Sequence, residues 1–203
     1  MIYISEEIPT DLQYFDAYQK LPIWRREKCG RFSGMRDKKL CVAAFFLLSY
    51  SLEKEYGIRE FEFGYGEFGK PYLLGHDGIF FNISHCGAGV ACAVSSAEIG
   101  VDIEEYRRFS PFNLRLAQTI CNENELTILQ ESGQAEIEFC KLFTKKESAA
   151  KLIGKGLGCG LKNILSEKIV HKLYSSEKYS VSAAAYFAEE NQRFYKVVEK
   201  ILN

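Results

Sequence analysis

Apolar residues recur at helical spacing between Ser33 and Tyr56, and the chain then reaches Gly57. A period of three to four residues indicates a helix with a buried face, and glycine is a usual residue directly after a helix end. The segment therefore predicts one long, well-buried helix. The apolar positions are Met35, Leu40, Val42, Ala43, Phe46, Leu47, Tyr50 and Leu52.

Short runs rich in β-branched and aromatic residues follow, each bounded by glycine. They span Phe61–Tyr65, Ile79–Ser84, Gly89–Ser95 and Ile99–Glu104. The second half has the same order of elements, with predicted helices at Phe112–Ile120, Asn122–Glu131 and Gln134–Gly154 and predicted strands at Tyr179–Phe187 and Arg193–Val198. The pattern predicts an α+β protein of two lobes, each with a helix packed on a mostly antiparallel sheet.

Composition and charge narrow the classes of function. The 203 residues carry 26 Lys and Arg against 27 Asp and Glu, so we expect no nucleic acid partner. The longest apolar run, Val42–Leu48, is much shorter than the roughly 20 residues of a membrane span, and the N-terminus is acidic where a signal peptide is basic. Seven irregularly spaced cysteines are typical of reduced, mostly buried thiols. We therefore expect a cytoplasmic protein without a membrane partner.

A predicted strand ends in carboxylates at Gly100-Val-Asp-Ile-Glu-Glu105. Because strand side chains alternate between faces, Asp102 and Glu104 should project together, opposite Val101 and Ile103. Two carboxylates on one face suit Mg²⁺, which commonly takes one or two carboxylates plus phosphate oxygens. The alternative interpretation is a solvated strand end.

The predicted helix from Gln134 to Gly154 carries Glu147 and Lys151 four residues apart, so both lie on one face. Such a pair is often only a surface ion pair. Neither GxGxxG nor GxxxxGK[ST] occurs in the glycine-rich stretch that follows, so the common phosphate loops are excluded.

Two further segments carry groups suited to phosphate. A predicted strand delivers Ser84 and His85 to a glycine-rich turn, and Lys70 precedes a proline. Adjacent strand residues face opposite ways, which argues against a Ser-His nucleophile pair. The only dense basic cluster, of a kind that is more often just solvated surface, comprises Arg25, Arg26, Lys28, Arg31, Arg36, Lys38 and Lys39.

Four motifs in this order resemble the 4'-phosphopantetheinyl transferases of the surfactin-synthetase-activating type: GKPYL (69–73), FNISHC (81–86), GVDIEE (100–105) and FTKKESAAKLIGKGL (143–157). The resemblance implies two similar lobes in a pseudo-twofold arrangement within a monomer. It places an N-terminal lobe at residues 1–98, a C-terminal lobe at 99–203 and the active site at their interface.

The resemblance also implies an enzyme that moves the 4'-phosphopantetheine arm of coenzyme A to a serine of an apo acyl or peptidyl carrier protein. Adenosine 3',5'-bisphosphate is released, and the ion is Mg²⁺, or Mn²⁺ in its place. The implied metal ligands are Asp102, Glu104 and Glu147; the implied catalytic residues are Glu147 and Lys151; the implied coenzyme A contacts are Arg25, Lys28, Lys39, Lys70, Ser84 and His85.

Several assignments stay open at this point. The base is Glu147 or a metal-bound water, and Glu125 is either a further base or, as we favour, a helix cap. Leu40 stands near the place of the family's arginine for the 3'-phosphate of coenzyme A, which leaves Lys38 or Lys39 for that contact.

The partner and the reaction class have alternatives as well. Lys145, Lys146 and Lys155 are either docking charges for an acidic carrier protein, from fatty-acid, polyketide or non-ribosomal peptide assembly, or a solvated helix face. A non-catalytic binding module and a Mg²⁺-dependent phosphohydrolase are the alternatives to a transferase.

Overall fold

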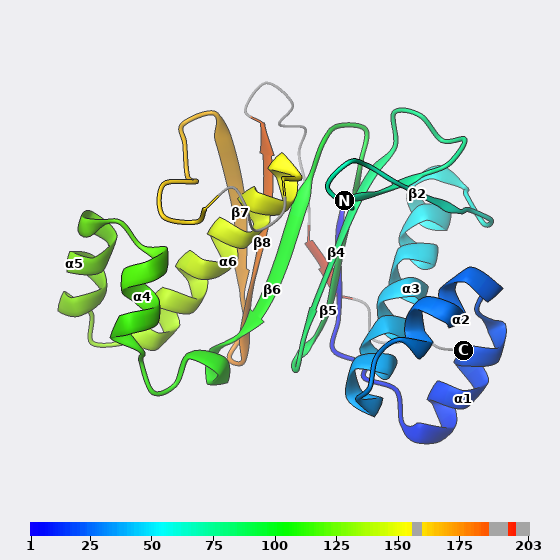
Figure 1. Ribbon diagram of the computed structural model, residues 1–203, viewed down its shortest axis with the longest axis horizontal. Helices are drawn as coiled ribbons and strands as arrows, with labels where there is room; N and C mark the ends of the chain where they lie inside the picture. The colour runs from blue at the N-terminus through cyan, green and yellow to red at the C-terminus, as the bar shows by residue number, and fades with distance from the viewer. Residues whose placement is uncertain (156–159, 187–194, 198–203) are drawn as a thin grey trace.

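The computed structural model describes residues 1–155, 160–186 and 195–197. Figure 1 shows two sheets at the centre of the molecule, with a group of helices on the outer side of each. The first sheet has the order β4 (Phe80–Cys86), β5 (Gly89–Ser95), β1 (Ile2–Ser5) and β9 (Tyr195–Val197), and the second has the order β6 (Gly100–Glu105), β8 (Tyr179–Tyr186) and β7 (Ile169–Ser175). A separate hairpin joins β2 (Phe63–Tyr65) to β3 (Pro71–Leu73).

Helices α1 (Asp11–Lys20), α2 (Ile23–Gly30) and α3 (Met35–Tyr56) belong to the first half, and α4 (Leu114–Ile120), α5 (Glu123–Glu131) and α6 (Ala135–Ile153) to the second. A short 3-10 helix, η1 (Tyr106–Phe109), follows β6. Among the described residues no helix is long and apolar enough to cross a membrane.

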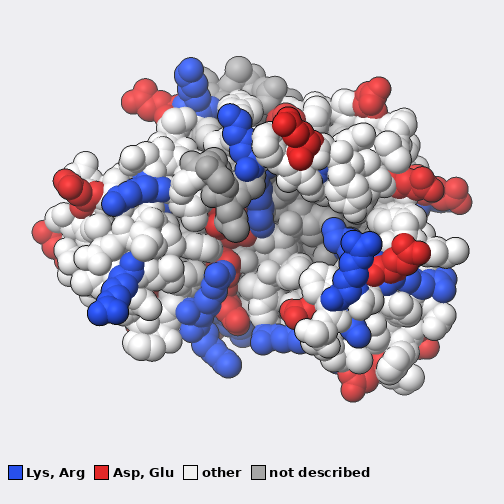
Figure 2. Space-filling view, in the orientation of Figure 1, with Lys and Arg blue, Asp and Glu red and all other residues white. Residues whose placement is uncertain are grey.

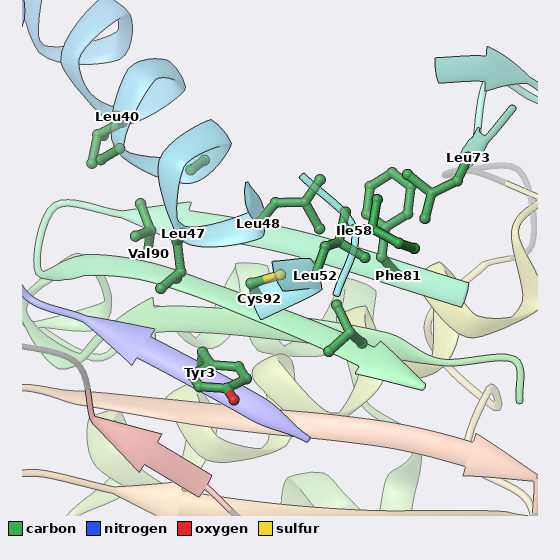
Figure 3. Packing of buried hydrophobic residues seen from close by; sticks show 13 residues of the cluster. Tyr3, Leu40, Leu47, Leu48, Leu52, Ile58, Leu73, Phe81, Val90 and Cys92 are labelled. Carbon is green, nitrogen blue, oxygen red and sulfur yellow. The ribbon is translucent and has the colours of Figure 1, made fainter. Parts of the chain in front are cut away.

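Helix α3 lies on the outer face of the first sheet, as its periodicity predicts. Its leucines at positions 40, 47, 48 and 52 are buried against Val90, Cys92 and Phe81 of the sheet, as Figure 3 shows. The helix ends where Gly57 adopts a left-handed conformation with φ 69°, and the Gly57 N–H donates to the Glu53 carbonyl at 3.0 Å. Glycine adopts this conformation without the strain that a Cβ would add.

The inner faces of the two sheets pack against each other and form a second core. Ile2, Ile4, Ala91 and Ala93 of the first sheet contact Val101, Ile103, Val181 and Ala183 of the second. Because β6 side chains alternate, burial of Val101 and Ile103 between the sheets turns Asp102 and Glu104 toward α6 on the outer face.

Helix α6 approaches β6 unusually closely. A Cβ on Gly100 would lie 2.0 Å from the carbonyl oxygen of Ser148, so only glycine permits this distance. The α6 residues Ala149, Ala150 and Leu152 pack on the second sheet. The close contact brings the α6 side chains directly over the carboxylates of β6.

The structure confirms the α+β class and the mostly antiparallel sheets. Six elements were not predicted: β1, α1, α2, β3, η1 and β7. Strand β9 pairs in parallel with β1, so the end of the described chain adds to the first sheet. The pseudo-twofold relation and the division at residues 98 and 99 stay predictions, and the remainder of the expected strands at 179–187 and 193–198 lies outside the described residues.

Six cysteines are free among the described residues and five of these are buried, as expected for reduced thiols. The seventh, Cys159, lies outside the described residues.

Candidate active site

Most of the predicted site residues meet where β4 lies beside β6. The Val101 N–H of β6 donates to the Asn82 side-chain oxygen of β4 at 2.9 Å. Two residues further along β4, the Ser84 hydroxyl donates to Asp102 Oδ1, on the β6 residue that follows Val101, at 2.7 Å. These two bonds fix the register between the edges of the two sheets, so motifs 18 and 19 residues apart in sequence share one site.

Asp102 is the centre of this cluster. Lys151 of α6 places its Nζ 2.7 Å from Asp102 Oδ1 and donates to the Ser84 hydroxyl at 2.7 Å. Asp102 is only 3% exposed, yet its second oxygen, Oδ2, is buried without a hydrogen-bond partner among the described residues. A buried carboxylate oxygen without a partner is unfavourable, so Oδ2 is suited to a cation or another ligand.

Glu104 and Glu147 add two carboxylates close to Asp102. Burial and the charge of Asp102 raise the pKa of Glu104 to about 7, and the same two causes raise the pKa of Glu147. Arg108 donates to Glu104 Oε1 and lowers this repulsion in part. Among the described residues no three acidic, histidine or cysteine side chains enclose a metal position as they stand. The site therefore attracts cations, although its carboxylates do not form a preassembled metal cage.

A cleft of about 270 Å³ opens beside these groups. Figure 2 shows basic and acidic side chains side by side along the middle of this face, where the two halves of the molecule meet. The cleft is lined by Phe68, Gly69, Lys70, Pro71, Asn82, Ile83, Glu147, Ala150, Lys151 and Gly154. Two motifs of the first half and one of the second therefore share one cleft.

Lys70 lines this cleft and also joins its two walls. Its Nζ lies 2.9 Å from Glu98 Oε2 and donates to the Leu152 carbonyl at 3.0 Å. That carbonyl belongs to the last turn of α6, where a cation also interacts favourably with the helix dipole. Lys70 thus holds the turn after β2 against the helix that carries Glu147 and Lys151.

His85 faces away from its neighbour Ser84, as strand alternation predicts. Ser84 is buried, whereas His85 is exposed at the surface. Neighbouring protein atoms nevertheless desolvate part of the His85 ring. This desolvation and the positive charge of Lys151 lower the pKa of His85. An anion beside the imidazole would reverse that effect and favour the charged ring.

The structure places two predicted coenzyme A contacts in helix packing. Arg25 is 5% exposed, donates to the Cys41 carbonyl at 3.0 Å and lies 5.7 Å over the Phe45 ring. Lys39 forms an ion pair with Asp11 at 2.8 Å. Both cations already have protein partners, so neither is aimed at the cleft beside Asp102.

Lys28 lies in a different hollow, of about 670 Å³, together with Arg31. Its ammonium is 5.7 Å from the Tyr65 ring centre. Desolvation and the charge of Arg25 lower the pKa of Lys28, so an anion bound here would gain from several cations at once.

Lys146 corrects one expectation. It is fully buried rather than a docking charge or part of a solvated face, because its ammonium donates to the carbonyls of Leu161 and Lys162 at 3.0 and 2.9 Å. It also lies 2.8 Å from Glu125 Oε2. Glu125 in turn accepts from the Asn122 N–H at 2.8 Å in a capping box, which confirms it as a helix cap.

Arg108 and Glu98 contact the site, although no sequence motif predicted them. Arg108 follows Glu104 by four residues in a 3-10 turn, and Glu98 precedes β6. The basic pair Arg107-Arg108, which follows the acidic strand end after one residue, was the available signal for Arg108. No local pattern pairs Glu98 with Lys70, which lies 28 residues earlier.

Comparison with known proteins gives matches within one family. Residues 98–198 match the model of the 4'-phosphopantetheinyl transferase superfamily. The chain is 36% identical over 141 residues to a 4'-phosphopantetheinyl transferase of Bacillus subtilis, which covers 68% of this chain and 62% of that protein. It is 33% identical over 162 residues to the 4'-phosphopantetheinyl transferase ffp of Bacillus subtilis, covering 78% and 69%.

A holo-[acyl-carrier-protein] synthase of Shewanella amazonensis is 40% identical over 67 residues, which are 31% of this chain and 54% of that protein. A two-sheet α+β fold with a carboxylate and lysine cluster at the seam of its sheets, together with these matches, defines the class. The chain belongs to the 4'-phosphopantetheinyl transferase superfamily, as its motifs predict. The match to the 4'-phosphopantetheinyl transferase Sfp of Bacillus subtilis, 32% identical, spans 62% of that relative's length, as does the first match above.

Proposed function

We propose that this protein transfers the 4'-phosphopantetheine group of coenzyme A to a serine of an apo acyl or peptidyl carrier protein and releases adenosine 3',5'-bisphosphate. The observation that carries the proposal is the contact of Lys151 with Asp102 beside a cleft that Glu147 and Lys70 also line. This arrangement gives one pyrophosphate both a carboxylate base and a cationic leaving-group partner.

A divalent cation, Mg²⁺ or Mn²⁺, fits the chemistry of these residues. Asp102 Oδ2 is buried without a described partner, and Glu104 and Glu147 have raised pKa values because they are buried beside Asp102. Asp102, Glu104 and Glu147 would hold the ion through their oxygens. When bound, the ion neutralises negative charge on the pyrophosphate that the carboxylates would otherwise repel.

In the proposed reaction the serine oxygen of the carrier protein attacks the phosphorus that bears pantetheine. The bond from this phosphorus to the bridging oxygen breaks, and its electron pair stays on the departing adenosine 3',5'-bisphosphate. Glu147 accepts the serine proton, a role that a raised pKa favours. The ammonium of Lys151 stabilises the charge that grows on the departing oxygen.

The remaining cations serve the nucleotide end of coenzyme A in this proposal. His85 gains charge beside a phosphate, and Ser84 orients Lys151 through its hydroxyl. Lys28 and Arg31 supply a second anion site in their own hollow. Lys39 and Arg25 reach an anion only if they exchange their present partners.

Mass spectrometry tests the proposal directly. Incubation with coenzyme A, Mg²⁺ and an apo carrier protein should add one phosphopantetheine group to the carrier, and a carrier whose serine is replaced by alanine should gain nothing. A binding module leaves the carrier unchanged, and a phosphohydrolase cleaves coenzyme A without any carrier. Either result refutes the transferase proposal.

The role of Lys151 has its own matched test. In single-turnover transfer with saturating coenzyme A, Lys151→Ala should slow transfer by about a hundredfold or more, because it removes stabilisation of developing charge. Lys141→Ala, on the same helix but outside the lining of the cleft, should keep a near-normal rate. A cytoplasmic location and a monomeric state stay predictions from the sequence.

A further inference from the structure

Arg108 occupies a position among the three predicted metal ligands. It lies in η1, directly after the strand that carries Asp102 and Glu104, and its guanidinium donates to Glu104 Oε1. The guanidinium carbon is 5.0 Å from the ring centre of Phe143 and 5.3 Å from that of Phe109. The side chain is 51% exposed. Two aromatic faces therefore hold a half-exposed cation against a carboxylate that is 11% exposed.

The charges around Arg108 match those that a metal ion would need. Asp102 and Glu147, in addition to Glu104, stabilise its positive charge electrostatically. Lys151 neutralises Asp102 in the same way from the other side. Two of the three carboxylates are thus paired with a side-chain cation. The guanidinium of Arg108 therefore lies beside a carboxylate that a bound ion would also contact.

We propose that Arg108 is a positioning residue that competes with the divalent cation for the Glu104 carboxylate and thereby sets the affinity of the site for the ion. The inference rests on the proposed function, since it takes the three carboxylates as the metal ligands. Arg108 donates to Glu104 Oε1, so an ion that takes this oxygen would displace the guanidinium, and an ion that takes Oε2 would meet its positive charge.

The release is feasible because Arg108 keeps other interactions when it leaves Glu104. It is half exposed, so water can solvate the guanidinium, and its contacts with Phe143 and Phe109 do not depend on Glu104. The ion would replace the guanidinium as the partner of the nearly buried Glu104 carboxylate, so that charge would not be left unpaired. Arg108 therefore changes the affinity of the site for the ion without blocking the site.

Binding of Mn²⁺ alone, in the absence of coenzyme A, tests the inference without any turnover. Titration calorimetry or the electron paramagnetic resonance signal of free Mn²⁺ gives the Kd for the full chain. Arg108→Gln should bind Mn²⁺ about tenfold more tightly than the wild type, because one positive charge beside a divalent site is lost. Arg107→Gln, which removes an exposed charge one residue away, should bind as the wild type does. Arg108→Lys, which keeps the charge, should stay within about twofold.

Each outcome has a defined meaning. Equal affinity in Arg108→Gln and wild type, or an equal gain in Arg107→Gln, overturns the competition. Weaker binding in Arg108→Gln also overturns it, since Arg108 would then orient Glu104 as a ligand. Mn²⁺ binding that survives Asp102→Asn unchanged, or no binding in any variant, overturns both this inference and the metal assignment. Thermal unfolding without Mn²⁺ establishes that each variant is folded. The carrier-loading assay is separate, so failure of the transferase proposal is distinguishable from failure of this one.

Discussion

Replacement of Lys146 by methionine should destabilise the protein strongly. Methionine keeps the length and the apolar part of the side chain but removes the buried ammonium. That ammonium donates to the carbonyls of Leu161 and Lys162 and pairs with Glu125, so three acceptors lose a partner at once. The perturbation therefore isolates the polar contribution of a fully buried lysine.

The expected loss of stability follows from the burial of Lys146 and Glu125. Removing one partner of a buried ion pair costs about 3–5 kcal/mol because the other charge is left unpaired. Glu125 is 16% exposed and still accepts from Asn122, so part of its charge remains satisfied. We expect about 3 kcal/mol, which for a chain of this size lowers Tm by about 6–12 °C.

Urea and thermal unfolding, followed by circular dichroism, measure this loss. The matched control is Lys145→Met, the adjacent and partly exposed lysine, which should change the free energy of unfolding by no more than about 0.5 kcal/mol. Equal stability of the two variants would show that the buried contacts of Lys146 do not stabilise the fold. A second variant, Glu125→Gln, should also destabilise, because it leaves the buried ammonium without its counter-charge.

Three further predictions concern the surroundings of the site. Gly100→Ala should destabilise the fold and slow transfer, because its Cβ would overlap the Ser148 carbonyl; chemical denaturation and single-turnover rates measure both. Burial lowers the pKa of His171 to about 4. Between pH 6.5 and 4 the imidazole of His171 therefore binds a proton in the unfolded chain but stays neutral in the folded protein. Wild type should therefore lose about 2 kcal/mol more stability than His171→Gln over that range, and parallel pH-dependent unfolding curves would contradict this. Lys70→Met frees the Leu152 carbonyl and should raise KM for coenzyme A more than it lowers kcat, and an unchanged KM would argue against its role in the cleft.

The sequence predicted elements whose signal is local. The long helix before Gly57 was found within two residues of its observed start, because helical period and a glycine stop both lie within the segment itself. Strand β1 was missed because its four residues, Ile2–Ser5, are all buried and show no alternation. Its partners are β5 and β9, about 90 and 190 residues later, and such pairing leaves no trace in a short apolar run.

The site residues likewise divide into those with a local sequence signal and those placed by tertiary packing. Alternation along one strand predicted that Asp102 and Glu104 share a face, and the structure has both facing α6. Lys145 and Lys146 look alike in sequence, yet only Lys146 meets the carbonyls of a later loop, so tertiary packing alone distinguishes them. Arg108 was missed for the same reason, since a 3-10 turn has no period that would aim it at Glu104.

Strand β6 explains why the fold and the site depend on each other. Val101 and Ile103 point into the core between the sheets, and Asp102 and Glu104 point toward α6 from the same strand. A shift of one residue in register would exchange these sets, burying two charges between apolar sheets and losing two hydrophobic contacts. The apolar residues thereby hold the carboxylates in place. Ile103→Ala should therefore lower the free energy of unfolding by about 2–5 kcal/mol. The transfer rate should fall only to the extent that the register of β6 loosens.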